Sequence, residues 1–556
     1  MIMGVLLSVY SDKKFNEDQA LLVEQAVKLI ESYGKKEVRC FQNDKVLIAQ
    51  WDFNAYKQAA WLQNDTQIAS LVGHPLISDN RTDDLQCLAE SHLLSSNLSE
   101  SEGAFCFVKY TPHNHHLTIA TDPLGLRPFF VMEYKGLKII SSRVSVFKEL
   151  GLELTANADA LTEYATLGYY LLDHTPYLEV ACSYPSEIIS LKPDEEQRSH
   201  YFDWVELAKQ NLTMKQAVSN IDRAFKRCCD KYLSVDQNVI STLSGGLDSR
   251  TIATELRRRN ANVKAFNFSR QKTQDLACAI AYAEHQSIDL DIIEVSDTQK
   301  ASVEDRLGKH WQSELKNTPT NIERPQLSWS GNGGSVGIGL IYYSEPLYQA
   351  ALTGDPEILV DAYLEQQYAY LPESIVEDAQ QLQDNLRKNI LKSLEPLSDL
   401  PLEKAYQLFL FLNDQHHHLS IPFEEITTFK MEFCLPMYSW KVLAAPLGLP
   451  VEEVRKHKFY LQWLHHSYPQ ATEVAWQAYP GHIPCPHPMP AIDQWQMASD
   501  KRTAASEVIA TWKKAYRFKS HQLLKKSRIS VLCILHLLGL KNARPQLNVV
   551  NKLIHW

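Results

Sequence analysis

Short apolar runs separated by turn residues fill the first two hundred positions of the chain. Runs of this length, bounded by polar and turn-forming residues, are typical of β-strands. The predicted strands are residues 5–10, 45–50, 104–110, 116–121, 129–133 and 138–142. A Pro-His-Asn-His sequence between the third and fourth runs suits a hairpin turn. We therefore expect residues 1–200 to be β-rich.

The pattern changes after residue 200. Ala217, Ile221, Ala224 and Phe225 recur at helical spacing. Strand-like and helix-like stretches then alternate, namely strand 238–243, helix 251–259, strand 263–268, helix 275–285 and strand 288–295. This order predicts a parallel, doubly wound sheet. From about residue 300 to the end, the pattern is mainly helical, with a glycine-rich interruption.

Length and composition narrow the class of protein. A chain of 556 residues is too long for one ordinary core and favours two or three domains. The net charge of −10 gives no support for a nucleic-acid partner. Ten scattered cysteines without a CxxC pair favour reduced thiols and a cytoplasmic location. We see no signal peptide, and the apolar stretch at residues 529–540 is shorter than the about 20 residues that a membrane span needs.

The most informative stretch is Ser-Gly-Gly-Leu-Asp-Ser at residues 244–249, between a predicted strand and a predicted helix. Glycines allow close backbone approach, and a helix N-terminus directs N–H groups at an anion such as phosphate. Asp248 suits such a site only if a cation intervenes, and Mg²⁺ accepts both carboxylate and phosphate oxygens. The stretch lacks the Gly-Lys-Ser/Thr of a kinase-type loop. A plain glycine turn with a helix cap is the alternative interpretation.

This stretch resembles the signature of the asparagine synthetase family. The resemblance implies that ATP is split to AMP and pyrophosphate, that a carboxylate becomes an acyl-adenylate, and that an amine attacks it. The residues that it assigns to pyrophosphate are Ser244, Gly245, Gly246, Asp248 and Ser249. Asp248 is also the implied Mg²⁺ ligand, and Leu243 and Phe268 are expected to frame the adenosine. The implied cofactors are ATP and Mg²⁺.

A second glycine-rich loop at residues 330–339 resembles the family's Gly-x-Gly-Gly-Asp-Glu loop. Gly333 and Gly334 are expected to offer amide donors to an adenylate. Ser335 and Val336 replace the acidic pair, which puts the magnesium geometry or the substrate class in doubt. A surface loop without function is the alternative.

Two further matches lie downstream. Residues 431–437 resemble the family's Glu-Val-Arg-x-Pro-Phe stretch, although Cys434 stands in place of the arginine. Lys458 matches the lysine of the family's Gly-Lys-x-x-Leu helix start. A fixed cation stabilises the charge that develops when a carboxylate attacks ATP, and a base assists amine attack. We therefore predict Lys458 and Glu432 as catalytic residues; a solvated helix lysine is the alternative for Lys458.

Residues 102–107 and 122–129, with Thr82 and Asp83, resemble the glutaminase domain of the same family, an αββα sandwich of the Ntn-hydrolase type. Active members carry a cysteine directly after the initiator methionine, and its α-amine serves as the base. This chain reads Met-Ile-Met, and its nearest cysteine, Cys40, is internal. We therefore expect no glutamine hydrolysis.

Together these matches predict an α/β protein with three parts. They are a glutaminase-like domain at 1–200, an ATP pyrophosphatase domain with a doubly wound parallel sheet at 210–470, and a basic helical extension at 471–556. The predicted function is an ATP-dependent amide ligase acting on a small-molecule or peptide carboxylate and an amine donor. Open alternatives are a lasso-peptide or lactam cyclase, sugar-acid amidation in polysaccharide biosynthesis, and a non-catalytic nucleotide-binding relative. The sequence also leaves open a homodimer, a pathway partner protein and the role of the basic tail.

Two histidine-containing stretches raise the question of a metal. Residues 414–418 end in three consecutive histidines, and residues 481–487 combine histidines with a cysteine among prolines. Consecutive histidines on a helix point in different directions, which disfavours a shared ion. The prolines of the second stretch fit a rigid loop equally well.

Overall fold

The computed structural model describes residues 4–34, 38–90, 93–234, 238–269, 273–294, 306–310, 327–367, 371–419, 422–423, 430–490, 505–518 and 523–554. The chain divides into two compact units. The first unit comprises Met1–Leu150, Ser183–Ser344 and His418–Met497. The second unit comprises Gly151–Cys182, Glu345–His417 and Ala498–Trp556.

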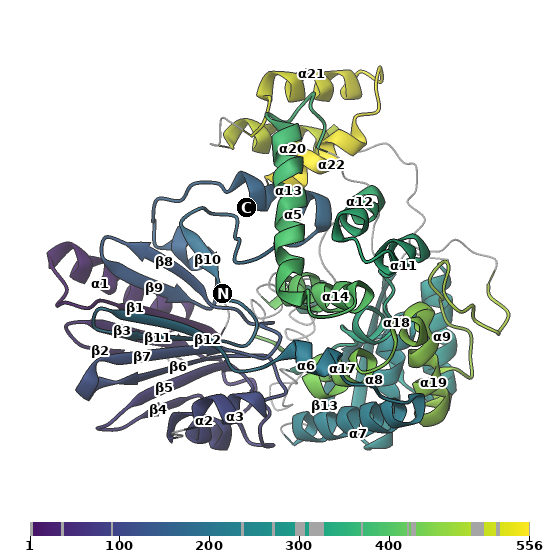
Figure 1. Cartoon of the computed structure of the whole chain (residues 1–556), viewed down its shortest axis with the longest axis horizontal. Coiled ribbons are helices and arrows are strands. Elements are labelled where there is room, and N and C mark those ends of the chain that lie inside the picture. Colours follow the sequence, from purple (N-terminus) through teal and green to yellow (C-terminus); the bar gives the residue numbers. More distant parts are fainter. Residues whose placement is uncertain are drawn as a thin grey trace. The chain divides into compact units, whose positions relative to one another are not determined.

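Two antiparallel sheets stack in the first unit (Figure 1). Five strands of one sheet lie in this unit in the order β8-β9-β1-β3-β2. They are β1 (Val5–Tyr10), β2 (Val38–Gln42), β3 (Val46–Trp51), β8 (Phe130–Tyr134) and β9 (Leu137–Ser141). The other sheet has the order β12-β11-β7-β6-β5-β4. Its strands are β4 (Trp61–Gln63), β5 (Ile68–Gly73), β6 (Phe105–Thr111), β7 (His116–Thr121), β11 (Glu187–Lys192) and β12 (Glu195–His200).

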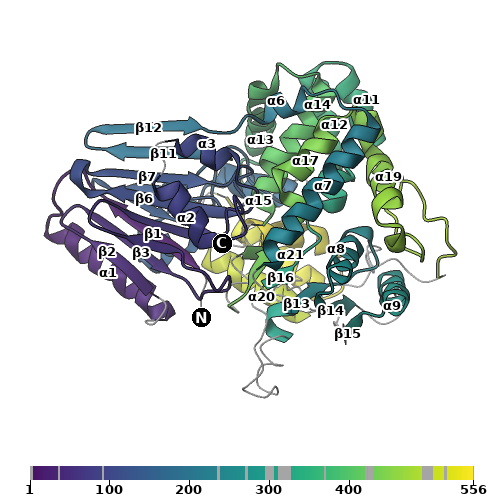
Figure 2. The same cartoon turned by 90° about the horizontal axis from the view of Figure 1, so that it is seen from below.

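Apolar side chains from the facing sides of the two sheets form the core between them. Leu6 and Ile48 from one sheet and Val108 and Ile119 from the other belong to one buried apolar cluster. Helix α1 (Glu17–Tyr33) packs on the outer face of the first sheet, and α2 (Arg81–Glu90) with α3 (Leu94–Ser99) covers the second (Figure 2). The predicted αββα sandwich is therefore confirmed.

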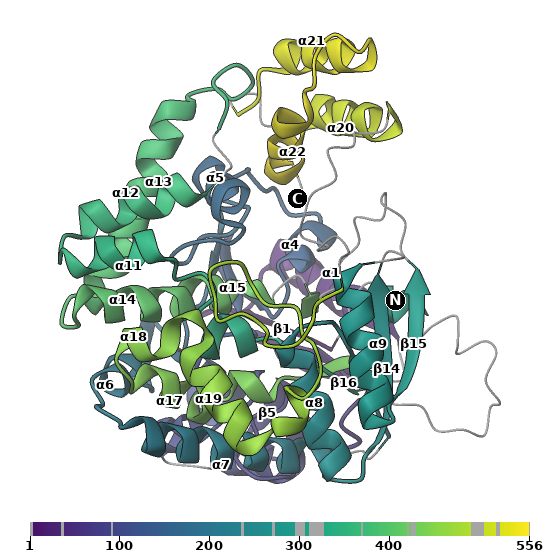
Figure 3. The ribbon, with the colours of Figure 1, turned by 90° about the vertical axis from the view of Figure 1, so that its right-hand side faces the viewer.

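A parallel sheet forms the other half of the first unit (Figure 3). Its order is β15-β14-β13-β16-β17. Its strands are β13 (Asn238–Thr242), β14 (Asn262–Ser269), β15 (Asp289–Glu294), β16 (Leu327–Trp329) and β17 (Glu432–Cys434). The parallel sheet is confirmed, with two strands more than the sequence pattern indicated.

Helices connect and cover these strands. α8 (Leu247–Arg258) follows β13, and α9 (Gln274–Gln286) follows β14. Thr213 and Gln216 form a capping box at the start of α7 (Met214–Leu233), and the Thr273 side chain caps α9. Further α-helices of this unit include α4 (Ser145–Glu149), α6 (Trp204–Ala208), α17 (Trp440–Leu447), α18 (Val451–Val454) and α19 (Lys458–Ser467).

The second unit is mainly helical. Its helices are α5 (Ala158–Leu167), α11 (Glu345–Leu352), α12 (Pro356–Gln366), α13 (Ala379–Leu394), α14 (Leu402–Phe409), α15 (His416–His418), α20 (Ala505–Arg517), α21 (Lys526–Leu537) and α22 (Arg544–Leu553). A short strand, β10 (Val180–Cys182), also belongs to it. Leu161 of α5 shares one buried cluster with Val508 and Leu547, so the C-terminal helices pack within this unit. Among the described residues, no helix is long and apolar enough to cross a membrane.

Candidate functional site

The loop at residues 244–249 lies where β13 gives way to α8. Gly246 is the N-cap of α8 and has an extended backbone, with φ −83° and ψ −179°, and no side chain caps the helix. The Ser244 N–H donates to the Ser249 hydroxyl at 3.0 Å, and the Gly246 N–H donates to the Ser244 hydroxyl at 3.3 Å. The two serines therefore fix the loop around an uncapped helix N-terminus, where an anion is favourable.

The two glycines of the loop have different environments. A Cβ on Gly245 would lie 2.7 Å from the backbone oxygen of Asp275, so α9 leaves no room for a side chain there. The Gly245 N–H also donates to an Asp275 carboxylate oxygen at 2.9 Å. Among the described residues, a Cβ on Gly246 would meet only the Ser244 hydroxyl, at 3.5 Å. Packing against α9 explains why residue 245 is a glycine. The space beside Gly246 is open and fits a phosphate close to the backbone.

Asp248 is held by residues from two other segments. Its carboxylate accepts hydrogen bonds from the Ser335 N–H at 2.8 Å, the Ser335 hydroxyl at 2.7 Å and the Tyr460 hydroxyl at 3.0 Å. Burial raises the pKa of Asp248, and these hydrogen bonds act in the opposite direction. A carboxylate offers about four acceptor positions, so one position remains with which Asp248 fits a Mg²⁺ ion.

The second glycine loop lies directly against the first. A Cβ on Gly334 would stand 2.6 Å from Asp248 Cγ, and one on Gly331 would stand 2.7 Å from the Asp248 carbonyl carbon. Gly333 has φ +92°, which glycine adopts without strain. From Gly334 to Ile338 the chain forms a π-helical turn that directs Ser335 at Asp248. Ser335 therefore supplies hydrogen-bond donors at the position where the family pattern has a carboxylate.

The two residues expected to frame an adenosine differ in exposure. Leu243 is 1% exposed and belongs to an apolar core cluster with Ala253, Ala265 and Ala279. Its backbone oxygen accepts a hydrogen bond from the Asn267 side chain at 2.8 Å. Phe268, near the end of β14, is half-buried. The side chain of Leu243 is thus part of the core, and only its backbone lies at the loop.

Glu432 lies at the start of β17 and is 3% exposed. Its carboxylate forms an ion pair with Arg127, whose guanidinium also lies 4.0 Å from the centre of the Phe423 ring. Burial raises the pKa of Glu432, and the nearby Arg127 charge lowers it. A Cβ on Gly4 would come within 3.4 Å of Glu432 Oε1. Glu432 is therefore bound to the sandwich, and among the described residues its hydrogen bond and ion pair are with Arg127 and not with Asp248.

Lys458 is the first residue of α19. Its Nζ donates to the Glu452 backbone oxygen at 2.9 Å and forms an ion pair with the Glu452 carboxylate. The lysine side chain is 36% exposed. Two positions further along the same helix, Tyr460 reaches Asp248. The structure thus brings α19 to the site, with the Lys458 amine bound to Glu452.

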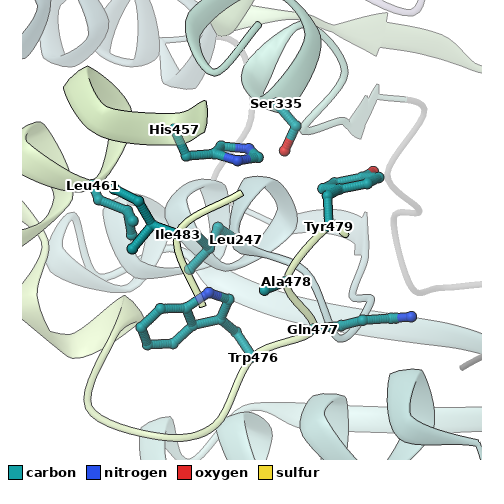
Figure 4. Close-up of a pocket in the computed structure, with 9 residues that line it drawn as sticks. All are labelled: Leu247, Ser335, His457, Leu461, Trp476, Gln477, Ala478, Tyr479 and Ile483. Atoms are coloured by element: carbon teal, nitrogen blue, oxygen red, sulfur yellow. The ribbon is translucent and has the colours of Figure 1, made fainter. Parts of the chain in front are cut away.

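A small pocket opens beside the start of α8 (Figure 4). It is lined by Leu247, Ser335, His457, Leu461, Trp476, Gln477, Ala478, Tyr479 and Ile483. Most of these side chains are apolar or aromatic. The segment 476–483 is fastened to the loop, because the Gln477 N–H donates to the Gly245 oxygen at 2.8 Å. Residues beyond position 470 therefore contribute to the site.

His457 forms part of the pocket wall. It has a left-handed backbone with φ 64°, at the position where the family motif has glycine. Its Nδ1 lies 3.0 Å from Nδ1 of His482, and burial lowers the pKa of His457 to about 3. His457 is therefore neutral at ordinary pH. His482 itself belongs to the stretch 481–487, which contributes no cluster of three metal-ligating groups among the residues that the structure describes.

Several residues of this site were not found from the sequence. Arg250, directly after the loop, is fully buried and donates to the backbone oxygens of Ala475 at 2.7 Å and Cys278 at 2.9 Å. Its position directly after the Ser-Gly-Gly-Leu-Asp-Ser stretch is the sequence feature that could have identified Arg250 as part of the site. Tyr460 lies inside the Lys-x-x-Leu match, but nothing in the sequence connects its hydroxyl to Asp248.

Two stretches of the chain match known domain families. Residues 85–202 match a glutamine amidotransferase domain family, and residues 220–313 match the asparagine synthase family. The two domains, in this order, give the chain the architecture of the asparagine synthetase family, whose synthase domain is that of ATP-dependent amide ligases. No curated protein matches the sequence.

Two solved structures match part of the chain at low similarity. The structure of an allosteric regulatory enzyme of purine biosynthesis is 11% identical, with 59% of this chain and 74% of that chain covered and a TM-score of 0.26. Glutamine phosphoribosylpyrophosphate amidotransferase from B. subtilis, complexed with ADP and GMP, is 12% identical, with 60% and 77% covered and a TM-score of 0.24.

Proposed function

We propose that the protein activates a carboxylate with ATP, forming an acyl-adenylate and pyrophosphate, and that an amine then attacks the adenylate to give an amide. The observation that carries this proposal is the open space beside Gly246 at the uncapped start of α8. Ser244 and Ser249 border it with hydroxyl groups. A helix N-terminus with free space and hydroxyl donors is suited to a pyrophosphate group.

Asp248 is the residue that would hold Mg²⁺ in this site. When bound, the ion neutralises charge on the phosphate oxygens. Ser335 and Tyr460 orient the carboxylate, since both donate to it. The second loop lies close to Asp248 at Gly334, but the Gly334 N–H, expected to donate to an adenylate, donates to the Gly331 oxygen at 3.2 Å. This arrangement supports one magnesium position with Asp248 as its protein ligand.

Lys458 is assigned to the charge that develops as the carboxylate attacks ATP. For this role its amine must leave Glu452, a half-exposed partner on the preceding turn. Such partly exposed pairs are worth about 0–1 kcal/mol, so exchange for a phosphate is inexpensive. Glu432 is assigned a positioning role through Arg127, or the role of the base if the ion pair opens.

The amine donor in this proposal is not glutamine. The sequence that enters β1 reads Met1, Ile2, Met3 and Gly4, which offers neither a thiol nor a hydroxyl. Gly4 is buried, and even a Cβ there would contact Glu432. Free ammonia or an amine on the substrate itself fits this arrangement, the latter as in cyclases of lasso-peptide or lactam type. All ten cysteines lie in the described part of the chain and none forms a disulfide, so we assign the protein to the cytoplasm.

The pocket lining bears on the substrate. Leu247, Leu461, Trp476 and Ile483 give it an apolar surface close to Ser335. Such a surface favours a carboxylate with an apolar portion, for example a peptide, over aspartate or a sugar acid. A non-catalytic nucleotide-binding protein is the second candidate, and the Lys458–Glu452 pair favours it.

ATP–pyrophosphate exchange across a panel of free amino acids, apolar acids, sugar acids and short peptides tests the proposal. We expect Mg²⁺-dependent exchange with at least one peptide or apolar acid, and its loss in Asp248→Asn. Calorimetry with ATP and Mg²⁺ is run in parallel. Binding without exchange for any carboxylate would support the non-catalytic candidate, and absence of both would refute the nucleotide site. Ammonia release from glutamine would refute our proposal that the sandwich does not hydrolyse glutamine.

A further inference from the structure

Three buried side chains with metal-ligating atoms meet in the second unit. Cys182 ends the strand β10, and His416 and His417 form the start of α15. Their exposed fractions are 1%, 1% and 8%. The nucleotide site in the first unit uses none of the three, so the cluster is independent of the proposed function.

The spacing of the ligand atoms suits a small tetrahedral ion. Cys182 Sγ, one nitrogen of His416 and one nitrogen of His417 all lie within 4.8 Å of one another. Cys182 Sγ is 3.9 Å from His416 Nε2, and the two imidazole rings have centres 4.3 Å apart. A tetrahedral Zn²⁺ with bonds of about 2.3 Å to sulfur and about 2.0–2.1 Å to nitrogen separates those atoms by about 3.6 Å. The Cys182–His416 separation of 3.9 Å is close to this value, and the remaining pairs, all within 4.8 Å, must approach one another when the ion binds.

The local backbone explains how consecutive histidines come to face one centre. We expected residues 416–418 to point apart, as on a regular α-helix. The chain from Leu410 to Gln415 is instead π-helical, and α15 is only three residues long. Wide turns of this kind are frequent at functional sites because they re-aim side chains. The third ligand comes from 234 positions earlier in the chain, so no spacing motif revealed it.

The surroundings also suit metal ligation. His417 forms a hydrogen bond with the backbone of Leu172, a non-glycine residue in the left-handed region with φ 56°. A backbone partner on one ring nitrogen fixes the tautomer and leaves the other nitrogen for an ion. Strained backbone next to such a cluster is common at ligand sites.

We propose that Cys182, His416 and His417 bind one Zn²⁺ ion. The Cys182 thiol loses its proton on binding, and two neutral imidazoles and the thiolate leave a fourth position for water or another ligand. Bound in this way, the ion joins the 151–182 segment to the helices that end at His417. Metal binding then stabilises the second unit, because unfolded chain does not preserve the site.

The metal content of the full chain, prepared with zinc and without a histidine tag, is the first measurement. We expect one Zn²⁺ per chain by mass spectrometry. After removal of zinc with a chelator, one equivalent of Co²⁺ should give tetrahedral ligand-field absorption and a thiolate-to-metal charge-transfer band. Cys182→Ser should lose that band, and His416→Ala should lose the tetrahedral absorption.

Matched controls are available in the same chain. Cys533→Ser removes another buried thiol of the second unit, and His418→Ala removes the exposed neighbour of the two ligands. Both should keep the metal and the spectrum. Absence of a charge-transfer band in the wild-type chain would refute the proposal, as would its survival in Cys182→Ser. If the ligand variants fail to fold, the wild-type Co²⁺ titration alone decides.

Discussion

Substitution of Gly246 by alanine separates a nucleotide loop from a structural turn. The backbone of Gly246 is extended, and the new methyl group would meet only the Ser244 hydroxyl at 3.5 Å. Such a change stabilises the folded state by about 0.4–1 kcal/mol, because alanine reduces the conformational freedom of the unfolded chain. The loss of a favourable N-cap costs about 0.5–1 kcal/mol, since glycine is preferred to alanine there. The two effects nearly cancel, so the stability should change by less than about 1 kcal/mol.

Substitution of Gly245 by alanine is the matched control, because the same methyl group meets a different environment. There it would lie 2.7 Å from the Asp275 backbone oxygen and 2.8 Å from Asp275 Cα. Overpacking of this kind costs about 1–3 kcal/mol. Gly245→Ala should therefore lower the free energy of unfolding clearly more than Gly246→Ala does.

The specific effect on ATP binding should belong to Gly246→Ala, the variant that changes the stability less. A methyl group on Gly246 occupies the space that a phosphate would use, so we expect the dissociation constant for ATP to rise at least about tenfold, or about 1.4 kcal/mol. Calorimetry gives the dissociation constant, and urea unfolding gives the stability. If Gly246→Ala folds and binds ATP like the wild-type chain, the loop is not a phosphate site. If it fails to fold, the steric reasoning is wrong.

Three other predictions follow from buried polar groups. Glu432→Gln leaves Arg127 buried without its ion-pair partner and should lower the free energy of unfolding by about 3–5 kcal/mol, whereas methionine at both positions should recover most of it. If urea unfolding shows that Glu432→Gln lowers the free energy of unfolding by less than about 1 kcal/mol, the Arg127–Glu432 pair has no structural role. Ser335→Ala removes a hydrogen bond that lowers the pKa of Asp248, so the acid limb of the exchange activity should move to higher pH; an unchanged profile would exclude Asp248 from that limb. Burial lowers the pKa of Lys404 from 10.5 to about 8, so stability should rise between pH 8 and 10.5, where only the unfolded state holds the proton. Lys404→Met should abolish that rise and stabilise the chain at pH 7 by up to about 3 kcal/mol, and a steep rise that persists would point to another group.

The sequence predicted the elements whose patterns are long enough to be distinctive. The strands around residues 5–10 and 116–121 and the helices after β13 and β14 lie where their apolar patterns indicated. β16 and β17 have three residues each, too few for any period to be visible. β16 pairs with β13 and β17 pairs with β16, so their place in the sheet depends on these contacts and not on their own sequence.

Within the site, too, local features were predictable from the sequence and long-range contacts were not. The turn at residues 244–249 is local, so its residue types alone indicated an anion site at a helix start. The partners of Asp248 come from positions 335 and 460, and a hydrogen bond across such separations has no local signature. Likewise, the motif that marked Glu432 gave no sign that Arg127 would be its partner.

The amidotransferase motifs of this chain have a structural role that does not depend on glutamine hydrolysis. Glu102, at the start of one motif, accepts from Lys231 at 2.7 Å and from the Ser439 hydroxyl at 2.9 Å, and both partners belong to the parallel-sheet half. Arg127, in the other motif, pairs with Glu432 of β17. Each buried charge would be left unpaired by substitution of its partner, at a cost of several kcal/mol. The motifs therefore hold the sandwich to the parallel sheet, and their presence in a sequence does not by itself indicate glutamine hydrolysis.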